Sequence, residues 1–445
     1  MTAQAATRPR LLQAMVDAFR QEDVRRKLLF TLAMLVVFRF VAHVPVPNID
    51  RDNLKQAFEE NSLLDFLSIF SGGALQNLSV AALGVYPYIT ATIVIQVLTP
   101  LVPSLRAAQE EGEQGRRRIQ VISHWIAVPM AFVQGYGQIL FINQSSSGGV
   151  IRDFNLVEHP VGTLATLCTL TAGTMFLVWI GELITENGIG NGVSVIIFGG
   201  IVARLPSLIP NASTASIIGI LTIAVLALGL TALVVFFQEA QRRVPVQYAR
   251  SAFRGGRMYR QQGQSHIPLR VNMAGMIPLI FAFSIMILPA VFFSYFTNTG
   301  GVVGSVANFF VDQFQQGRGG AGATPVYWVV LFALVVVFTF FYTMVQYQQQ
   351  DIAKSLQRQG AFIPGIRPGR PTEEYLMRVV TRITWGGAFF LGFVAVTPYF
   401  VGLLTDARAL TISATGLLIV VAVVLDTMKQ LEAQLLMRNY EGFIR

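Results

Sequence analysis

Ten apolar stretches of roughly 20 residues run along almost the whole chain and constrain its fold more than any other feature. A helix needs about 20 apolar residues to cross the ~30 Å hydrocarbon core of a bilayer, so each stretch is long enough for one membrane span. Only 13% of the residues are charged, about half the roughly 25% of soluble domains. We therefore predict an all-α polytopic membrane protein with spans at residues 28–44, 78–98, 121–142, 161–182, 191–209, 215–237, 272–295, 326–347, 383–400 and 411–428.

Positive charge is distributed unevenly between the segments that join the expected spans. If residues 1–27 are cytosolic, 26 of the 33 Lys and Arg side chains fall on the cytosolic side and six on the opposite side, with Arg39 inside the first span. Cytoplasmic loops of membrane proteins are enriched in Lys and Arg, so both termini are expected in the cytoplasm. Residues 1–27 contain acids and no small-residue cleavage site, which predicts a cytosolic extension and not a removable signal peptide.

Ten spans divide into two groups of five, and an odd number of spans per group inverts the second group relative to the first. This count permits an inverted repeat with a site between the halves, residues 28–209 and 210–428. Two long basic segments, residues 238–271 and 348–382, are expected as cytosolic loops, and residues 429–445 as a cytosolic tail.

The sequence lacks the motifs of several enzyme classes. It contains no phosphate-binding GxxxxGK[ST] loop, no HExxH, no GxSxG and a single cysteine, Cys168. The glycine-rich run at residues 188–192 follows no soluble strand and is expected to be a flexible cytoplasmic turn. We predict no enzymatic activity, no cofactor and no metal site.

Ionisable residues are nearly absent from the expected spans. Ion-coupled transporters normally keep Asp, Glu, His or Lys at membrane depth, whereas only Arg39, His124 and Arg204 intrude here. This pattern favours a pore that does not leak ions over an inverted-repeat small-molecule secondary transporter, which remains the alternative. An intramembrane protease would need catalytic residues at membrane depth that are missing. A packing scaffold without a conduction path also stays open.

Glycines and polar residues interrupt the apolar sequence just before the second span. Irregular backbone near membrane depth is tolerated only where it is buried in protein or faces a water-filled cavity. Residues 62–75 are therefore a candidate re-entrant plug, with a simple loop as the alternative. The candidate plug residues are Leu63, Leu64, Phe66, Leu67, Phe70, Ser71, Gly72 and Gly73.

From about residue 26 to residue 445 the chain resembles the SecY family, the channel subunits of bacterial protein translocons. The resemblance rests on eight motifs that occur in order. They are HVPVPNID at 43–50, FSGGALQNLSVAALGVYPYITATIVIQVL at 70–98, EEGEQGRRRI at 110–119, ITENGIGNGVSVIIFGGIV at 184–202, RRVPVQYA at 242–249, HIPLRVNMAGMIPLIFA at 266–282, GAFIPGIRPGRPTEEYL at 360–376 and LDTMKQLEAQLLMRNYEGFIR at 425–445.

The resemblance implies a clamshell of two inverted five-helix halves with a pore between them, an outer plug and a lateral gate toward lipid. The family's ring of six aliphatic pore residues falls on Val85, Ile89, Val193, Ile197, Ile280 and Ile419. A narrow aliphatic collar offers no polar groups to an ion and forms no specific hydrogen bonds with a passing chain. Without the resemblance, these six residues would be interpreted as ordinary helix packing.

Two further surfaces follow from the same resemblance. The lateral gate lies between the second and seventh spans, where ordinary small-residue packing is the alternative for its candidates Thr90, Thr92, Gln96, Asn272 and Ser284. In the family, arginines of the two basic loops dock a ribosome or motor, although topology alone could explain most of these arginines. The docking candidates are Arg242, Arg243, Arg254, Arg257, Arg367 and Arg370.

The function implied is that of a passive channel, in a bacterial plasma (inner) membrane, for unfolded polypeptides and for hydrophobic segments released into lipid. The implied partners are SecE, SecG, the SecA ATPase, the ribosome with its RNA, signal peptides, nascent chains and membrane lipids. The chain departs from the family pattern at residues 123–125, 348–353 and 413–418, which leaves local details of the gate and of the eighth span open.

Overall fold

The computed structural model describes the chain from residue 21 onward, with gaps. The described residues are 21–47, 49–60, 64, 68, 71–99, 101–144, 149–151, 154, 158–212, 217–254, 257–275, 277–294, 304–309, 325–350, 352–404 and 414–441.

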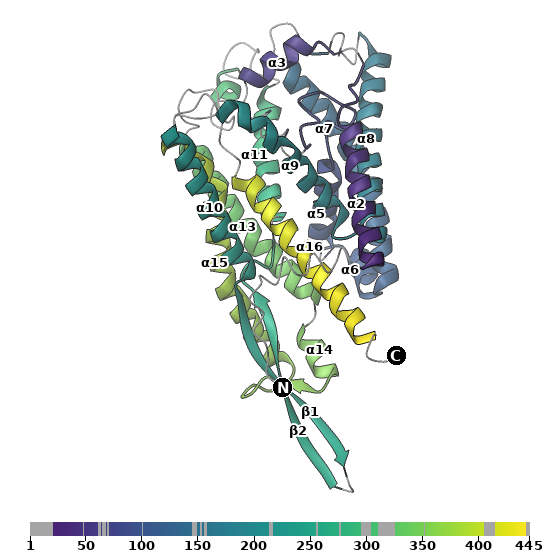
Figure 1. Ribbon diagram of the computed structural model, residues 1–445, viewed down its shortest axis with the longest axis vertical. Helices are drawn as coiled ribbons and strands as arrows, with labels where there is room; N and C mark the ends of the chain where they lie inside the picture. Colours follow the sequence, from purple (N-terminus) through teal and green to yellow (C-terminus); the bar gives the residue numbers. More distant parts are fainter. Residues whose placement is uncertain are drawn as a thin grey trace.

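Long helices dominate the molecule, and a helix overlaps each of the ten expected spans (Figure 1). Short helices α3 (Arg51–Glu60), α6 (Pro103–Glu110) and α14 (Ile352–Arg358) lie between them. The long helices are α2 (Glu22–Val41), α5 (Tyr86–Leu98), α7 (Glu113–Gln144), α8 (Pro160–Asn187), α9 (Gly192–Ala212), α10 (Ile217–Glu239), α11 (Ile277–Ser294), α13 (Pro325–Gln350), α15 (Arg370–Leu404) and α16 (Ala414–Glu441).

Four helical segments in the described part are long and apolar enough to cross a membrane by themselves. A fifth crossing is formed if α5 and α6, which are bent by 100° at their junction, count as one broken span. The structure thus establishes a mostly helical membrane protein. The four segments are Glu113–Asn143, Pro160–Asn187, Pro325–Arg358 and Arg370–Thr397.

The predicted start of the second span is wrong, because residues 71–85 form turns and the helix begins only at Tyr86. The backbone of this segment pairs with the chain that leaves α2: Val46 N–H donates to Leu78 O (3.1 Å), and Val80 N–H donates to Val44 O (2.9 Å). Leu78 adopts a positive φ of 39°. These hydrogen bonds satisfy backbone groups that a helix would otherwise pair, so an apolar sequence stays non-helical inside the protein.

The prediction of an all-α fold is also wrong, because the expected loop at 238–271 is a long β-hairpin. Strands β1 (Gln241–Arg254) and β2 (Arg257–Arg270) are antiparallel, and β1 also pairs with the short strand β3 (Ala361–Phe362). Figure 1 shows the hairpin extending away from the helices, at the end of the molecule opposite α3. A search for long apolar runs cannot find such strands, because most of their residues are polar.

The root of the hairpin is held by a small hydrophobic core. Val244, Val246 and Leu269 are buried and cluster with Leu356 of α14 and Leu376 of α15. Val244 and Val246 are two residues apart, so the alternation of a strand directs both side chains to one face. The sheet is therefore packed against the C-terminal helices α14 and α15.

The glycine-rich turn at 188–192, expected to be flexible, is tied to helices α2 and α16. Ile189 N–H donates to Thr31 Oγ1 of α2 (3.1 Å), and Gly190 N–H donates to Gln430 Oε1 of α16 (3.0 Å). Ile189 is also buried against Leu431. The turn consequently joins the N-terminal part of the chain to its last helix.

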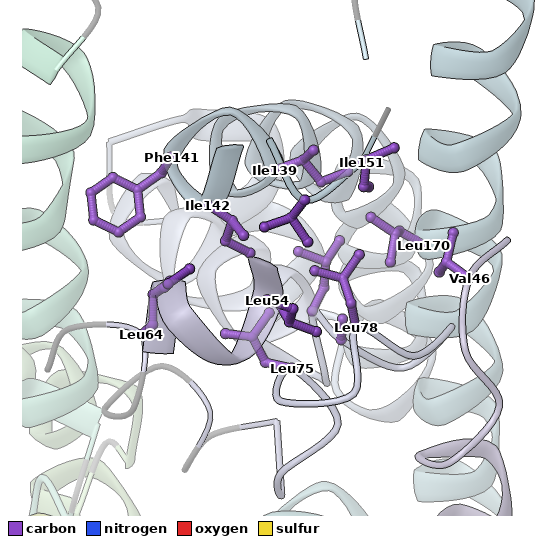
Figure 2. Packing of buried hydrophobic residues seen from close by; sticks show 14 of the residues in the cluster. Val46, Leu54, Leu64, Leu75, Leu78, Ile139, Phe141, Ile142, Ile151 and Leu170 are labelled. Atoms are coloured by element: carbon purple, nitrogen blue, oxygen red, sulfur yellow. The ribbon is translucent and has the colours of Figure 1, made fainter. Parts of the chain in front are cut away.

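Three apolar clusters form the interior of the helical body. One lies under α3, where Figure 2 shows Leu54, Leu75 and Leu78 close to Ile139 and Ile142 of α7. A second cluster is built from α10, α11, α13, α15 and α16. The third joins α2, α8, α9 and α16 around the start of α5 and contains most of the predicted pore ring.

Candidate functional site

Five of the six predicted ring residues lie in one apolar cluster. Val85, Ile197 and Ile419 are at most 2% exposed, and Ile89 and Val193 pack against them half-buried. Val193 and Ile197 are one helical turn apart on α9 and so share a face. The sixth residue, Ile280 of α11, is 3% exposed but is outside the described members of this cluster.

The last part of the candidate plug, which contains Gly72, lies directly against α9. A Cβ atom built on Gly72 would be 2.6 Å from Gly200 Cα, and one built on Gly200 would be 2.5 Å from Gly72 Cα. The two backbones are therefore too close for any side chain at either position. Gly72 also has φ +65°, a conformation that glycine adopts without steric cost.

Local hydrogen bonds fix the backbone of this segment. Ser71 Oγ donates to Ser68 O (3.1 Å) and accepts from Leu75 N–H (3.1 Å), while Gly73 N–H donates to Ser68 O (2.8 Å). Leu64 is helical and fully buried. Other predicted plug residues lie outside the described residues: Leu63, Phe66, Leu67 and Phe70.

Arg39 contributes a contact that the sequence did not assign to it. Its Nη1 donates to Gly72 O at 2.8 Å, which connects α2 to the plug segment. The neighbouring Phe38 is 2% exposed and belongs to the cluster that contains the ring. A charged residue inside an apolar span was the available signal, because such residues are costly in a membrane and usually functional.

The predicted gate residues make contacts with different helices. Thr90 is buried and accepts a hydrogen bond from Gln134 Nε2 of α7 (3.1 Å). Gln96 of α5 is hydrogen-bonded to the hydroxyl of Tyr342 on α13, so α5 is linked to α7 on one side and to α13 on the other. Gln134 and Tyr342 were missed, although a Gln within an apolar span is a detectable signal.

Two of the remaining gate candidates have other contacts among the described residues. Thr92 Oγ1 donates to Ile89 O of its own helix (2.8 Å). Asn272 is 4% exposed. Its backbone lies against α15, because a Cβ built on Gly387 would be 3.7 Å from Asn272 Cα. The side chain of Ser284 lies outside the described residues.

A polar cluster occupies the departure from the family pattern at residues 123–125. His124 Nε2 of α7 is 2.9 Å from Glu182 Oε1 of α8, which also accepts a hydrogen bond from Gln120 Nε2 (2.7 Å). The imidazole stacks on Tyr88 of α5 with ring centroids 5.2 Å apart. This cluster connects α5, α7 and α8 beside the predicted gate.

The two predicted docking loops are parts of one surface. Gln247 and Tyr248 of β1 pair with Phe362 and Ala361 of β3, only five residues before Arg367. The docking candidates with described side chains are all exposed; those of Arg254 and Arg257, paired at the far end of the hairpin, lie outside the described residues. The exposed candidates are Arg242, Arg243, Arg367 and Arg370.

The turn that carries Arg367 is fixed from both sides. Its carbonyl accepts a hydrogen bond from Thr372 Oγ1 (2.8 Å), and Gly365 and Gly369 have φ values of 82° and 105°. The side chain itself is directed to solvent. Guanidinium groups held this way suit phosphate or carboxylate partners.

The described residues contain no group of three His, Cys, Asp or Glu side chains that could hold a metal ion. Chemically, the central cluster offers apolar contact, and the exposed arginines of the basic surface offer charge and hydrogen-bond donors.

Comparison with known proteins identifies related sequences and folds. The SecY family model matches residues 79–428. The protein translocase subunit SecY of Streptomyces galbus is 40% identical over 453 residues, covering 98% of this chain and all of the relative. SecY of Halalkalibacterium halodurans is also 40% identical, with the same coverage.

Solved structures share the fold at low sequence identity. One is a SecY structure that concerns a plug domain stabilising the closed state and maintaining a membrane seal; its TM-score is 0.61 at 17% identity, over 92% of each chain. Another is Sec61 in the canine ribosome–channel complex from the endoplasmic reticulum, with a TM-score of 0.57 at 16% identity over 92% of each chain.

Proposed function

Because this chain belongs to the SecY family and is the protein-conducting channel subunit of a Sec translocon, we propose that it opens in two directions. One opening passes unfolded polypeptides across the membrane, and the other releases hydrophobic segments sideways into lipid. The protein is a channel and not an enzyme. Family membership also favours the channel over the small-molecule transporter that the sequence left open.

The architecture we propose has ten spans in two inverted halves of five, with both termini in the cytoplasm of a bacterium and the channel in its plasma membrane. A helix at each expected span supports this count, and so does the concentration of 26 basic residues on one side. The hairpin and the turn of Arg367 then lie on the cytosolic side.

The pore is closed by the aliphatic ring and sealed from outside by the plug. The observation that carries this proposal is that Val85, Ile89, Val193, Ile197 and Ile419 converge in one apolar cluster. Aliphatic side chains hold no ion hydration shell, yet they yield around any polypeptide sequence. The close approach of Gly72 to Gly200 supports a plug seated against a ring-bearing helix.

The lateral gate opens where α5 separates from its neighbours. The hydrogen bonds of Thr90 with Gln134 and of Gln96 with Tyr342 are polar contacts that must break or rearrange during opening. A signal peptide with 7–15 apolar residues gains free energy by leaving water, at about 25 cal/mol per Å² of apolar surface, and this gain offsets the separation of the helices.

The cytosolic surface binds the partners that supply energy. We propose that the exposed arginines of β1 and of the Arg367 turn contact the SecA ATPase or ribosomal RNA, and that SecE and SecG complete the membrane complex. The pairing of β1 with β3 supports a single docking unit, because it holds the two basic segments together.

Cysteine crosslinking tests the pore directly. The chain has only Cys168, so a Cys168→Ser background allows single cysteines at the six ring positions. A stalled secretory chain should crosslink to these positions and not to a cysteine at Val424, which lies on another face of α16 from Ile419. Crosslinking at Val424 as strong as at Ile419 would show that the ring residues only pack helices.

The topology is tested by labelling with a membrane-impermeant thiol reagent. Cysteines at positions 10, 256 and 440 should react only from the cytosolic side, and a cysteine at position 310 only from outside. Reaction of positions 256 and 310 from the same side would contradict the arrangement of ten spans.

A further inference from the structure

One face of α15 carries two arginines followed by three large aromatic side chains. Arg378, Arg382, Trp385, Phe389 and Phe393 follow one another at intervals of four, three, four and four residues. At 3.6 residues per turn this spacing places all five on a single face of the helix. We call these five residues the α15 lane.

The lane is open along its length. Trp385 is 50% exposed, Phe389 53% and Phe393 49%. Arg378 and Arg382 are exposed as well, and neither forms an ion pair with another described residue. The nearby carboxylate of Glu374 lies one turn before Arg378 on the same face, 3.9 Å from Arg370, the cation with which it is paired.

Aromatic side chains of α13 form one wall of the lane. Phe340 meets Trp385 edge-on with ring centroids 4.7 Å apart, and Phe332 lies 6.0 Å from Phe389. Trp385 and Phe389 also stack on each other at 5.6 Å. Next to Trp385, a Cβ on the exposed Gly386 would meet only a Val271 methyl group, at 3.9 Å, so the floor of the lane is unfilled there.

The order of chemistry along the lane follows the order of layers in a membrane leaflet. Arg382 and Phe393 are eleven residues apart, or about 16 Å along a helix, close to half of the ~30 Å hydrocarbon core. Tryptophan concentrates at the membrane interface, and arginines beside it reach the headgroup layer. With the topology proposed above, this interface is the cytosolic one.

We propose that the α15 lane is a binding site for one anionic phospholipid of the cytosolic leaflet. Its phosphate accepts hydrogen bonds from Arg378 and Arg382, whose guanidinium groups can each bind phosphate with two donors. One acyl chain lies over Gly386 and along Trp385, Phe389 and Phe393. The inference rests on the proposed orientation of the channel but on no property of its pore.

Charge complementarity selects this occupant. The two guanidinium groups need an anion, and the rest of the lane contains only apolar and aromatic surface in its described residues. A zwitterionic lipid has the same acyl chains without net charge, and a transmembrane helix from another subunit would have to present a carboxylate beside Arg382. These alternatives give different results in the following experiment.

Quenching of Trp385 by brominated lipids tests the site in the full-length chain. Trp125 and Trp179 are exposed and are replaced by Phe, which leaves Trp385 and the buried Trp328 as reporters. In nanodiscs, brominated phosphatidylglycerol should quench Trp385 at least about threefold more than brominated phosphatidylcholine at the same mole fraction. A W385F sample gives the background of Trp328.

Charge variants show whether the arginines cause the preference. R378Q/R382Q should make the two lipids equally effective, whereas R378K/R382K should retain most of the preference. The matched control R116Q/R117Q removes two exposed arginines from the start of α7 and should leave it unchanged.

Equal quenching by both lipids in the unmodified lane would overturn the proposal, and so would a preference that survives R378Q/R382Q. Protection of Trp385 from both lipids would also overturn it, in favour of a protein occupant. Ring crosslinking measured on the same variants separates these outcomes from a failure of the channel itself.

Discussion

The N-terminal and C-terminal halves of the channel pack their helices with a different balance of contacts. In the N-terminal half, helices and turns approach through glycine. Gly199 and Gly200 of α9 face Leu35 and Gly72, and Gly173 of α8 faces the carbonyl of Val80. An added Cβ at any of these three positions would meet a neighbouring atom within 2.7 Å.

In the C-terminal half, ring-to-ring contacts hold the helices together. Phe237 of α10 stacks on Phe390 of α15 with centroids 4.2 Å apart and planes 6° from parallel. Phe281 of α11 meets Phe338 of α13 edge-on at 4.4 Å. Close glycine contacts occur here as well, because a Cβ on Gly387 would be 2.5 Å from the Val271 carbonyl oxygen and one on Gly392 would be 2.6 Å from the Phe332 ring. Gly229 of α10, in contrast, has nothing within 4 Å of an added Cβ.

The difference affects how each half responds to change. Small residues let backbones come close, which is a common packing mode in membranes, but such a contact cannot accept even one methyl group. Aromatic pairs tolerate several geometries and lose contact only when a ring is removed. Packing of the plug segment should therefore be sensitive to an added side-chain atom, whereas packing of the C-terminal half should be sensitive to the loss of an aromatic ring.

The largest effect is expected in the aromatic half from Phe390→Ala. The side chain is 4% exposed, and truncating a buried Phe costs about 3–5 kcal/mol in soluble cores, an upper bound here because lipid tails are as apolar as the core. The apparent Tm of the purified protein in detergent should fall clearly, and Phe390→Leu should recover part of it. Phe236→Ala, at a site 68% exposed, is the matched control; an equal loss there would refute the difference.

Removing the guanidinium at the plug is expected to have the next largest effect. Arg39→Met deletes the donor to Gly72 O, and a hydrogen bond to a charged group contributes about 1.5–3 kcal/mol. Because every 1.4 kcal/mol is a tenfold change in equilibrium, the plug should leave its seat at least about tenfold more often. Ion conductance in planar bilayers measures this, and Arg39→Lys should restore part of the seal. Unchanged conductance in Arg39→Met would mean that the contact does not hold the plug.

A single methyl group at Gly200 tests the glycine contact. Gly200→Ala forces its Cβ against Gly72 and should cost the closed state about 1–3 kcal/mol, again visible as increased conductance. Gly229→Ala makes the same chemical change where space is open and should have no effect. If both variants conduct alike, the close approach of the two backbones is not what seats the plug.

The smallest effect on stability is expected at Arg367. Arg367→Glu changes an exposed side chain, so stability should stay within about 0.5 kcal/mol, while export driven by the motor should be impaired. Export from inverted vesicles at several salt concentrations measures the docking role, with Arg358→Glu as a control at another exposed position on the proposed cytosolic side. Normal export by Arg367→Glu at all salt concentrations would leave Arg367 as a topology determinant only.

The sequence by itself determined the class of the protein, because hydropathy and charge bias are local properties that can be summed along the chain. Apolar stretches predicted the helices that overlap all ten expected spans, and eight ordered motifs predicted the family to which the chain belongs. Five of the six ring positions lie within these motifs, and Ile419 precedes the last of them by six residues. Their convergence around α9 and α16 depends on how those helices are packed.

Tertiary structure decided the features whose cause lies far away in the chain. Residues 71–85 are non-helical because the chain after α2 satisfies their backbone, and the polar hairpin is held by a core that α14 and α15 supply. Gly72 must lack a side chain because Gly200 lies against it, and its φ of +65° also favours glycine. Propensity and periodicity depend only on neighbours in sequence. Contacts between distant backbone segments and between separate helices form only when the chain folds.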